Sequence, residues 1–150
     1  MEKSDIPESG MNALISIEQR GHPWKGTNYS RTDWTKNLEV KTLAEHPNAE
    51  ILFWVGCTAA LEKRSQNIAR AMASILKRAK VDFAILGDEE SCTGDPARRM
   101  GNEYLYQTLA KQNISTINKY NIQKVITTCP HCFNTIKNEY PGLGGNYEIM

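Results

Sequence analysis

Apolar positions follow two different patterns along this chain. After residue 50, short apolar runs alternate with longer segments in which apolar residues recur at helical spacing. The pattern predicts strands at 51–55, 83–86, 124–128 and 147–150, and helices at about 65–80, 95–120 and 130–139. Alternating strands and helices are typical of βαβ units with parallel strands. We therefore predict an α/β fold, a small Rossmann-like parallel sheet of three to four strands with flanking helices.

Two of the predicted helices carry more detailed expectations. In the helix at 65–80, the residues that repeat at intervals of four, three and four, and so mark its expected apolar face, are Ile68, Met72, Ile75 and Ala79. The helix at 95–120 should begin with Asp95 as its cap and Pro96 in the first helical position. Its apolar residues drift from one face to another, which indicates a break near Asn113.

Residues 1–50 have a different character, polar and interrupted by prolines. Their one apolar stripe consists of Met11, Leu14, Ile15 and Ile17. We predict one short helix followed by an irregular, extended arm, and a cysteine-rich α/β domain over 51–150. Trp24 and Trp34 lie in the arm and are expected to dock on the domain or on a partner. His22 and His46 are expected to be solvated.

Length and charge limit the classes of function. A chain of 150 residues with 40% hydrophobic residues can build a core without disulfides. The formal net charge is +1 and no long run of Lys or Arg occurs, so no nucleic-acid partner is expected. The longest apolar stretch, 51–61, is about half of the ~20 residues that a membrane span needs. Residues 1–5 lack the order of an export signal, which favours a cytoplasmic location and reduced thiols.

The strongest chemical signal is the set of four cysteines, spaced C-x34-C-x36-C-x2-C. They are Cys57, Cys92, Cys129 and Cys132. The first three follow the first three predicted strands, and the carboxyl ends of parallel strands meet at one edge of a sheet. Cys132 falls in the first turn of the next helix, where the helix dipole and unpaired N–H groups favour a thiolate. The spacing predicts that all four bind one inorganic centre.

Three kinds of chemistry fit this set. Four thiolates can ligate a [4Fe–4S] cluster, which would carry electrons, or a closed structural zinc ion. The C-P-H-C element alone also fits a thiol–disulfide oxidoreductase, an interpretation that leaves Cys57 and Cys92 unexplained. Gly56 and Gly94 would let the backbone approach the centre, and His131 would donate a hydrogen bond near it. Arg98 and Arg99 would either balance its charge or form a solvated helix face.

The elements C-x34-C-T-G-D and C-P-H-C resemble the first half of the cysteine-rich CCG repeat proteins. These include the B-type subunit of heterodisulfide reductase and related iron–sulfur oxidoreductases. The resemblance covers about residues 20–150, and Thr93 stands where the family has the second cysteine of C-C-G. It implies an electron-transfer domain or subunit of an iron–sulfur oxidoreductase, with Gly56, Thr93, Gly94 and His131 around the cluster. A structural zinc module that presents the tryptophan arm to a partner is the alternative.

The resemblance also carries expectations about partners. Family members usually contain two such repeats, often with a ferredoxin-like domain or a membrane segment. The chain ends on a predicted strand that no helix follows, so we expect it to belong to a larger polypeptide or to pair with a partner. Expected partners are a second CCG repeat, a ferredoxin-like domain or a flavoprotein. Through them the chain would associate peripherally with the inner face of the cell membrane, without a membrane span of its own.

Overall fold

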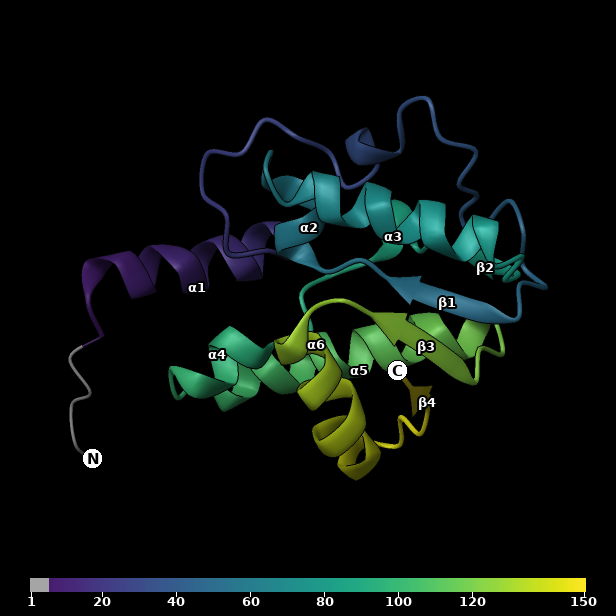
Figure 1. Ribbon diagram of the computed structural model, residues 1–150. Coiled ribbons are helices and arrows are strands. Elements are labelled where there is room, and N and C mark those ends of the chain that lie inside the picture. Colours follow the sequence, from purple (N-terminus) through teal and green to yellow (C-terminus); the bar gives the residue numbers. More distant parts are fainter. Residues whose placement is uncertain (1–5) are drawn as a thin grey trace.

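A computed structural model describes residues 6–150 and shows a four-stranded, fully parallel sheet in the order β2-β1-β3-β4 (Figure 1). The strands are β1 (Ile51–Trp54), β2 (Phe83–Ala84), β3 (Lys124–Thr127) and β4 (Glu148–Ile149). The predicted α/β class and all four predicted strands are confirmed. Residues 1–5, on which the expectation about an export signal depends, lie outside the described residues.

Helices cover both faces of this sheet (Figure 1). They are α1 (Glu8–Arg20), α2 (Cys57–Leu61), α3 (Gln66–Arg78), α4 (Asp95–Arg99), α5 (Glu103–Lys119) and α6 (Pro130–Asn134). A π-helical turn over Thr135–Glu139 continues α6, which confirms the helix predicted at 130–139. Helix α2 was not predicted. It is only five residues long and begins directly after Gly56, which turns the chain out of β1.

Strand β1 lies at the centre of two apolar cores. All four of its residues are buried, as expected for a parallel strand that is covered on both faces. Leu52 and Trp54 belong to a core that α1, α4 and α5 complete. Phe53 faces the other core, which α2 and α3 complete together with Trp34. Because side chains alternate along a strand, this one apolar run supports both layers.

The predicted apolar face of α3 is wrong at Ile68, Ile75 and Ala79, while its fourth residue, Met72, is partly buried and packs against the core. Ile68 is 54% exposed and Ile75 is 60% exposed. The side chains of α3 that pack in the core are Ala69, Ala73 and Leu76. This helix carries two apolar stripes one residue apart, and hydrophobic periodicity cannot choose between them. The structure buries the stripe with two alanines, whose small side chains let the helix lie close to the sheet.

The segment predicted as a single helix at 95–120 is divided at residues 100–102, and the break expected near Asn113 is absent because α5 runs through that buried residue. Asn102 caps α5, and its side-chain oxygen accepts a hydrogen bond from the N–H of Leu105 at 3.0 Å. The expected cap at Asp95 is also wrong. Gly94 precedes α4, and Asp95 is already its first residue.

The N-terminal segment contributes to both cores. Helix α1 confirms the predicted short helix, and its Leu14 and Ile17 are buried in the core that contains α5. Trp34 is buried against Phe53 in an edge-to-face contact with ring centroids 6.1 Å apart, so it docks on the domain as expected. Trp24 remains 40% exposed. Thr42 forms a parallel bridge with Ile85, so this segment also covers the outer edge of β2.

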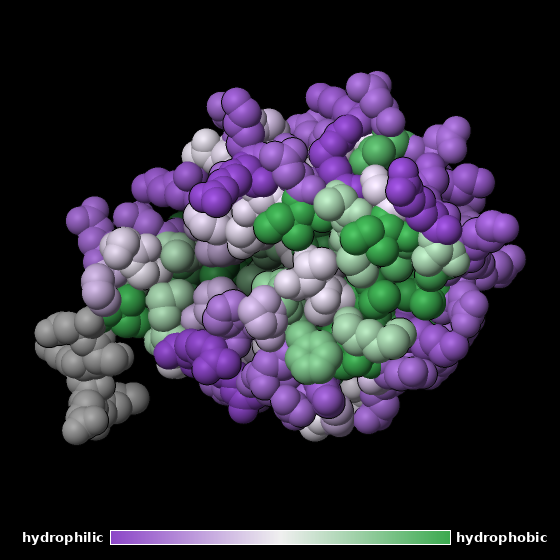
Figure 2. Space-filling view, in the orientation of Figure 1, coloured by the Kyte–Doolittle hydropathy of each residue, from purple (hydrophilic) through white to green (hydrophobic). Residues whose placement is uncertain are grey.

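Apolar side chains gather on the surface over the sheet near β1 and β3 (Figure 2). Ile126 of β3 is only partly buried on the face of the sheet that α3 covers, so α3 leaves this face incompletely covered. Ile149 of β4 is also partly buried, but it packs against the core on the opposite face. Within residues 6–150, none of the helices combines the length and the apolar character needed to cross a bilayer.

The register of α3 can be tested with two neighbouring substitutions. Leu76→Ala removes a buried side chain and should lower the free energy of unfolding by about 2–5 kcal/mol. Ile75→Ala is the matched control and should change it by less than about 0.5 kcal/mol, because this side chain lies mostly in water. Urea unfolding followed by circular dichroism measures both. A larger loss for Ile75→Ala would show that the predicted face, rather than the observed one, packs on the sheet.

Candidate functional site

The four cysteines lie at the carboxyl edge of the sheet, as the topology predicts. Cys57 is the first residue of α2, just after β1, and Cys92 lies in the loop between β2 and α4. Cys129 caps α6 after β3, and Cys132 lies within α6. All four are free thiols, and three of them are buried while Cys129 is half-buried.

The thiols form two pairs that meet at Gly56. The side chains of Cys57 and Cys92 lie close enough for each thiol to shift the pKa of the other. The Sγ of Cys129 accepts the backbone N–H of Cys132 at 3.5 Å. A Cβ placed on Gly56 would lie 3.5 Å from the Sγ of Cys132 and 3.6 Å from the Cβ of Cys129. As the side chains stand in residues 6–150, no three His, Cys, Asp or Glu groups are arranged around a single metal-ion position.

Each pair contains one sulfur that favours the thiolate and one that favours the thiol. The thiol of Cys92 lowers the pKa of Cys57, and the charge of Arg31 lowers it further, while burial opposes both. The thiol of Cys132, together with the backbone N–H groups of Cys132 and His131, lowers the pKa of Cys129 to about 6. The neighbouring thiol and burial raise the pKa values of Cys92 and Cys132 well above the usual range. Within each pair, one sulfur therefore loses its proton more readily than the other.

A buried ion pair lies directly beside the first thiol pair. The Nη1 of Arg31 lies 3.0 Å from Oε1 of Glu90, and the two side chains are only 9% and 2% exposed. The carboxylate of Glu90 also accepts the backbone N–H groups of Val55 and Gly56, at 3.0 and 2.9 Å. Burial raises the pKa of Glu90, and the charge of Arg31 opposes this shift. The Nη2 of Arg31 donates to the Sγ of Cys57 at 3.4 Å.

The carbonyl of Gly21 connects α1 to the same place. It accepts hydrogen bonds from Nη2 of Arg31 at 3.0 Å and from the backbone N–H of Cys92 at 2.7 Å. Gly21 ends α1 in the left-handed region, at φ 68°, and a Cβ there would lie 2.6 Å from Oγ of Ser91. A side chain here would be strained by the left-handed backbone and would crowd the hydroxyl of Ser91. Through the carbonyl of Gly21, the end of α1 holds the loop that carries Cys92.

Two buried side chains hold the other side of that loop. The Nδ2 of Asn113 donates to the carbonyl of Cys92 at 2.9 Å. The hydroxyl of Tyr140 accepts from the same amide at 3.1 Å and donates to the carbonyl of Thr93 at 3.2 Å. Thr93 is itself buried. The backbone at Cys92 is therefore fixed by α1 on one side and by α5 and Tyr140 on the other.

The remaining predicted site residues lie around this centre. Gly94 has φ 90°, and a Cβ there would lie 2.8 Å from Cδ2 of Tyr106, so the bulky neighbour at this glycine is Tyr106. Asp95 is buried and pairs with Nδ1 of His131 at 3.2 Å and with Nε of Arg99 at 2.8 Å. His131 is exposed. Its place beside the bound group remains a prediction, as do those of Gly56, Thr93 and Gly94.

Arg98 does not reach the thiols. It pairs with Glu103 at 3.5 Å and with Glu139 at 3.0 Å, and its guanidinium lies over the ring of Tyr106. Arg98 is therefore bound to carboxylates of neighbouring helical segments, and Arg99 to Asp95 of its own helix. Both arginines thus belong to a helix face that ion pairs stabilise.

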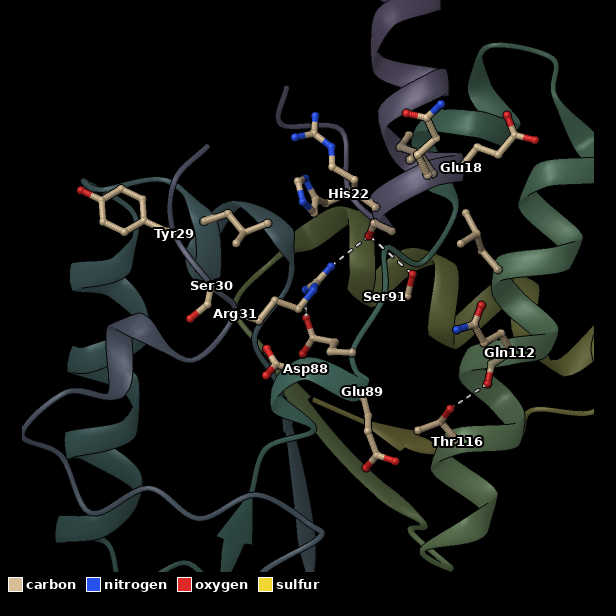
Figure 3. Close-up of a pocket in the computed structure, with 17 residues that line it drawn as sticks. Glu18, His22, Tyr29, Ser30, Arg31, Asp88, Glu89, Ser91, Gln112 and Thr116 are labelled. Carbon is tan, nitrogen blue, oxygen red and sulfur yellow. Dashed lines mark hydrogen bonds and ion pairs between the residues drawn. The ribbon is translucent and has the colours of Figure 1, made fainter. Parts of the chain in front are cut away.

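A cavity of about 620 Å³ opens next to the ion pair, between the end of α1, the arm, the loop after β2 and α5 (Figure 3). The residues that line it include Tyr29, Arg31, Asp88, Glu89, Ser91 and Gln112. His22 also lines it and is buried, which corrects the expectation that it is solvated. Burial and the charges of Arg31 and Arg20 lower the pKa of His22. His46 lies at the surface and pairs with Asp82 at 2.7 Å.

Sequence reasoning missed the residues that position the thiols. They are Gly21, Arg31, Glu90, Asn113 and Tyr140. Arg31 stands in a segment without periodicity, and Glu90 closes a run of acidic residues that is typical of an exposed turn. One signal in the sequence points to Glu90. It lies between a buried strand and a cysteine, where an acidic side chain exposed to water is not expected.

The chain has relatives among known proteins. The profile of the cysteine-rich domain (CCG) family matches residues 51–137. The chain is 38% identical to the EtfAB:quinone oxidoreductase of Syntrophomonas wolfei, with 99% of this chain and 22% of that protein aligned. It is 40% identical to the "Probable iron-sulfur-binding oxidoreductase FadF" of Bacillus subtilis, with 96% and 21% aligned.

A third relative shares less sequence identity with the chain. The chain is 30% identical to one subunit of the dihydromethanophenazine:CoB–CoM heterodisulfide reductase of Methanosarcina mazei, with 89% of this chain and 33% of that protein aligned. The chain therefore spans between a fifth and a third of these three curated relatives. No solved structure matches it significantly.

The close approach at Gly94 gives a test of the loop geometry. Gly94→Ala places a side chain in the left-handed region, at about 1–2 kcal/mol, and against Tyr106, which adds about 1–3 kcal/mol of crowding. The free energy of unfolding should fall by at least about 2 kcal/mol. Gly142→Ala is the control, because its Cβ meets nothing within 4 Å. It should leave stability unchanged or raise it by up to about 1 kcal/mol. Equal effects of the two substitutions would contradict the described loop.

Proposed function

The chain belongs to the cysteine-rich domain (CCG) family, and from this membership we propose that it is an electron-transfer domain or subunit of an iron–sulfur oxidoreductase. The proposed ligands of its cluster are Cys57, Cys92, Cys129 and Cys132. The observation that carries the proposal is the gathering of these four free thiols, from three separate loops, at one edge of the sheet. Relatives named as iron–sulfur or quinone oxidoreductases support it.

The residues present fit an iron–sulfur group. Thiolates are its usual protein ligands, and the donor set offers four of them, with no other ligand type in the pairs. The backbone N–H of Cys132 and the guanidinium of Arg31 already donate to sulfur, as is typical around such groups. When bound, the cluster would accept and release one electron. The chain would position it, shield it from water and set its potential.

The size of the cluster and the place of Thr93 belong to the proposal. Four thiolates match a [4Fe–4S] cluster, and a threonine hydroxyl is a poor ligand for iron where the family has a fifth cysteine. We therefore propose electron relay rather than cleavage of a disulfide substrate. Its partner would be a second CCG repeat, a ferredoxin-like domain or a flavoprotein. The place of action would be the cytoplasm or the inner face of the membrane, reached through that partner.

A second candidate, thiol–disulfide exchange at the C-P-H-C element, has one specific observation in its favour. The pKa of Cys129 is about 6 and that of Cys132 is raised, with the first sulfur half-exposed and the second buried. An accessible thiolate followed by a buried thiol is the arrangement that disulfide oxidoreductases use. This candidate gives Cys57 and Cys92 no role, whereas the cluster uses all four.

The first test is the content of the purified protein. After anaerobic purification, iron and acid-labile sulfide should each be found at about four per chain. An EPR signal should appear or disappear on reduction with dithionite. Stoichiometric zinc without sulfide would contradict the proposal and support a structural zinc module. Protein without metal that reduces disulfides as a dithiol would support the second candidate.

The second test is a substitution in the loop after β2. Cys92→Ser should remove most of the bound iron and sulfide, because it withdraws one of four ligands. Thr93→Ser is the matched control in the same buried loop and should keep the wild-type content. Iron and sulfide assays with circular dichroism separate loss of the cluster from loss of the fold. Full cluster content in folded Cys92→Ser protein would remove this residue from the ligand set.

A further inference from the structure

We propose that Arg31 is a positioning residue that raises the reduction potential of the cluster, and that Glu90 is the opposing charge that limits this effect. The inference depends on the proposed function, since it concerns the same four thiols. It adds an ion pair that lies outside the cysteine motif, with Arg31 in the N-terminal segment.

The geometry gives Arg31 one direct contact with the ligand set. Its Nη2 donates to the Sγ of Cys57 at 3.4 Å and to the carbonyl of Gly21 at 3.0 Å, while Nη1 lies on Glu90. The planar guanidinium holds its donors in a fixed fork and serves all three acceptors at once, whereas a lysine ammonium is a compact charge on a flexible stem. Arg31 is buried, so its charge acts on the sulfur with little screening by water.

Glu90 acts through the same contacts with the opposite sign. Its carboxylate is bound to Arg31 and to the N–H groups of Val55 and Gly56, the two residues before Cys57. The negative charge therefore lies next to the loop that carries the first ligand. It is held there by three donors and cannot turn away toward water.

The electrostatic consequence follows from the electron balance. Reduction of the bound cluster by one electron from a reduced partner, such as a flavoprotein, would form and break no bond. The four thiolates and the group that they hold would gain one negative charge, and the donor would lose one. A buried cation that donates a hydrogen bond to a ligand sulfur stabilises the more negative state, so it raises the potential. A buried anion at the same loop lowers it.

The test is a pair of nearly isosteric substitutions in the cluster-loaded chain. Arg31→Gln should lower the midpoint potential, and Glu90→Gln should raise it. Each shift should reach at least a tenfold change in the ratio of reduced to oxidised cluster at fixed potential, which is about 59 mV for one electron. EPR-monitored redox titration measures both. Arg70→Gln is the control, because Arg70 donates to the carbonyls of Trp34 and Lys36 and contacts no cysteine, and its shift should be smaller than tenfold.

The outcomes separate this inference from the proposed function. Wild-type chain without iron and sulfide would defeat the proposed function itself. A loaded wild type with shifts below tenfold, or with shifts of the same sign in both variants, would overturn the role of the ion pair alone. A general loosening of the site would move both potentials in the same direction. Shifts of opposite sign in the two variants therefore exclude a purely structural role. If only one variant folds, its potential is compared with that of the double variant Arg31→Gln with Glu90→Gln, which supplies the second measurement.

If neither single variant folds, the double variant Arg31→Gln with Glu90→Gln provides the answer. It buries no unpaired charge and retains amide groups that can bond to the neighbouring backbone. Its potential should lie below that of the wild type, because the charged donor to Cys57 is lost while the net charge of the pair is unchanged. A potential equal to that of the wild type would overturn the inference.

Discussion

The buried ion pair between Arg31 and Glu90 is the contact on which the rest of the site depends. Two charges taken out of water cost several kcal/mol each unless every partner is present. Here the partners come from three places, the end of α1 through Gly21, the turn after β1 and the loop after β2. The pair is stable only while these segments stay together. The positions of Cys57 and Cys92 are therefore tied to the packing of the N-terminal segment.

The parallel topology explains why the thiols meet, and the local backbone explains why they meet closely. Three strands deliver three loops to one edge of the sheet. Gly56 then places the backbone against Cys129 and Cys132, and Gly21 lets the loop before Cys92 close on α1. Asn113 and Tyr140 satisfy the carbonyls of Cys92 and Thr93 in the interior. The site is thus a feature of the whole fold, from α1 to Tyr140.

The sequence predicts the parts of this arrangement that depend on local pattern and topology. Buried parallel strands are typically apolar runs, so β1 and β3 and the edge where the cysteines lie can be found without a structure. The apolar face of α3 cannot be found in this way, because the helix has two apolar stripes one residue apart. Only packing against the sheet determines which of them is buried. Arg31 cannot be found either, since its partner lies 59 residues away and an ion pair leaves no periodic signal.

The most direct test of the central contact is a double-mutant cycle on Arg31 and Glu90, measured as the free energy of unfolding. Arg31→Met and Glu90→Gln should each cost about 3–5 kcal/mol, because each leaves a polar or charged group buried without its partner. The double variant should cost less than their sum by at least about 1 kcal/mol. Costs that add to within about 0.5 kcal/mol would show that the two side chains act independently, and would contradict the account.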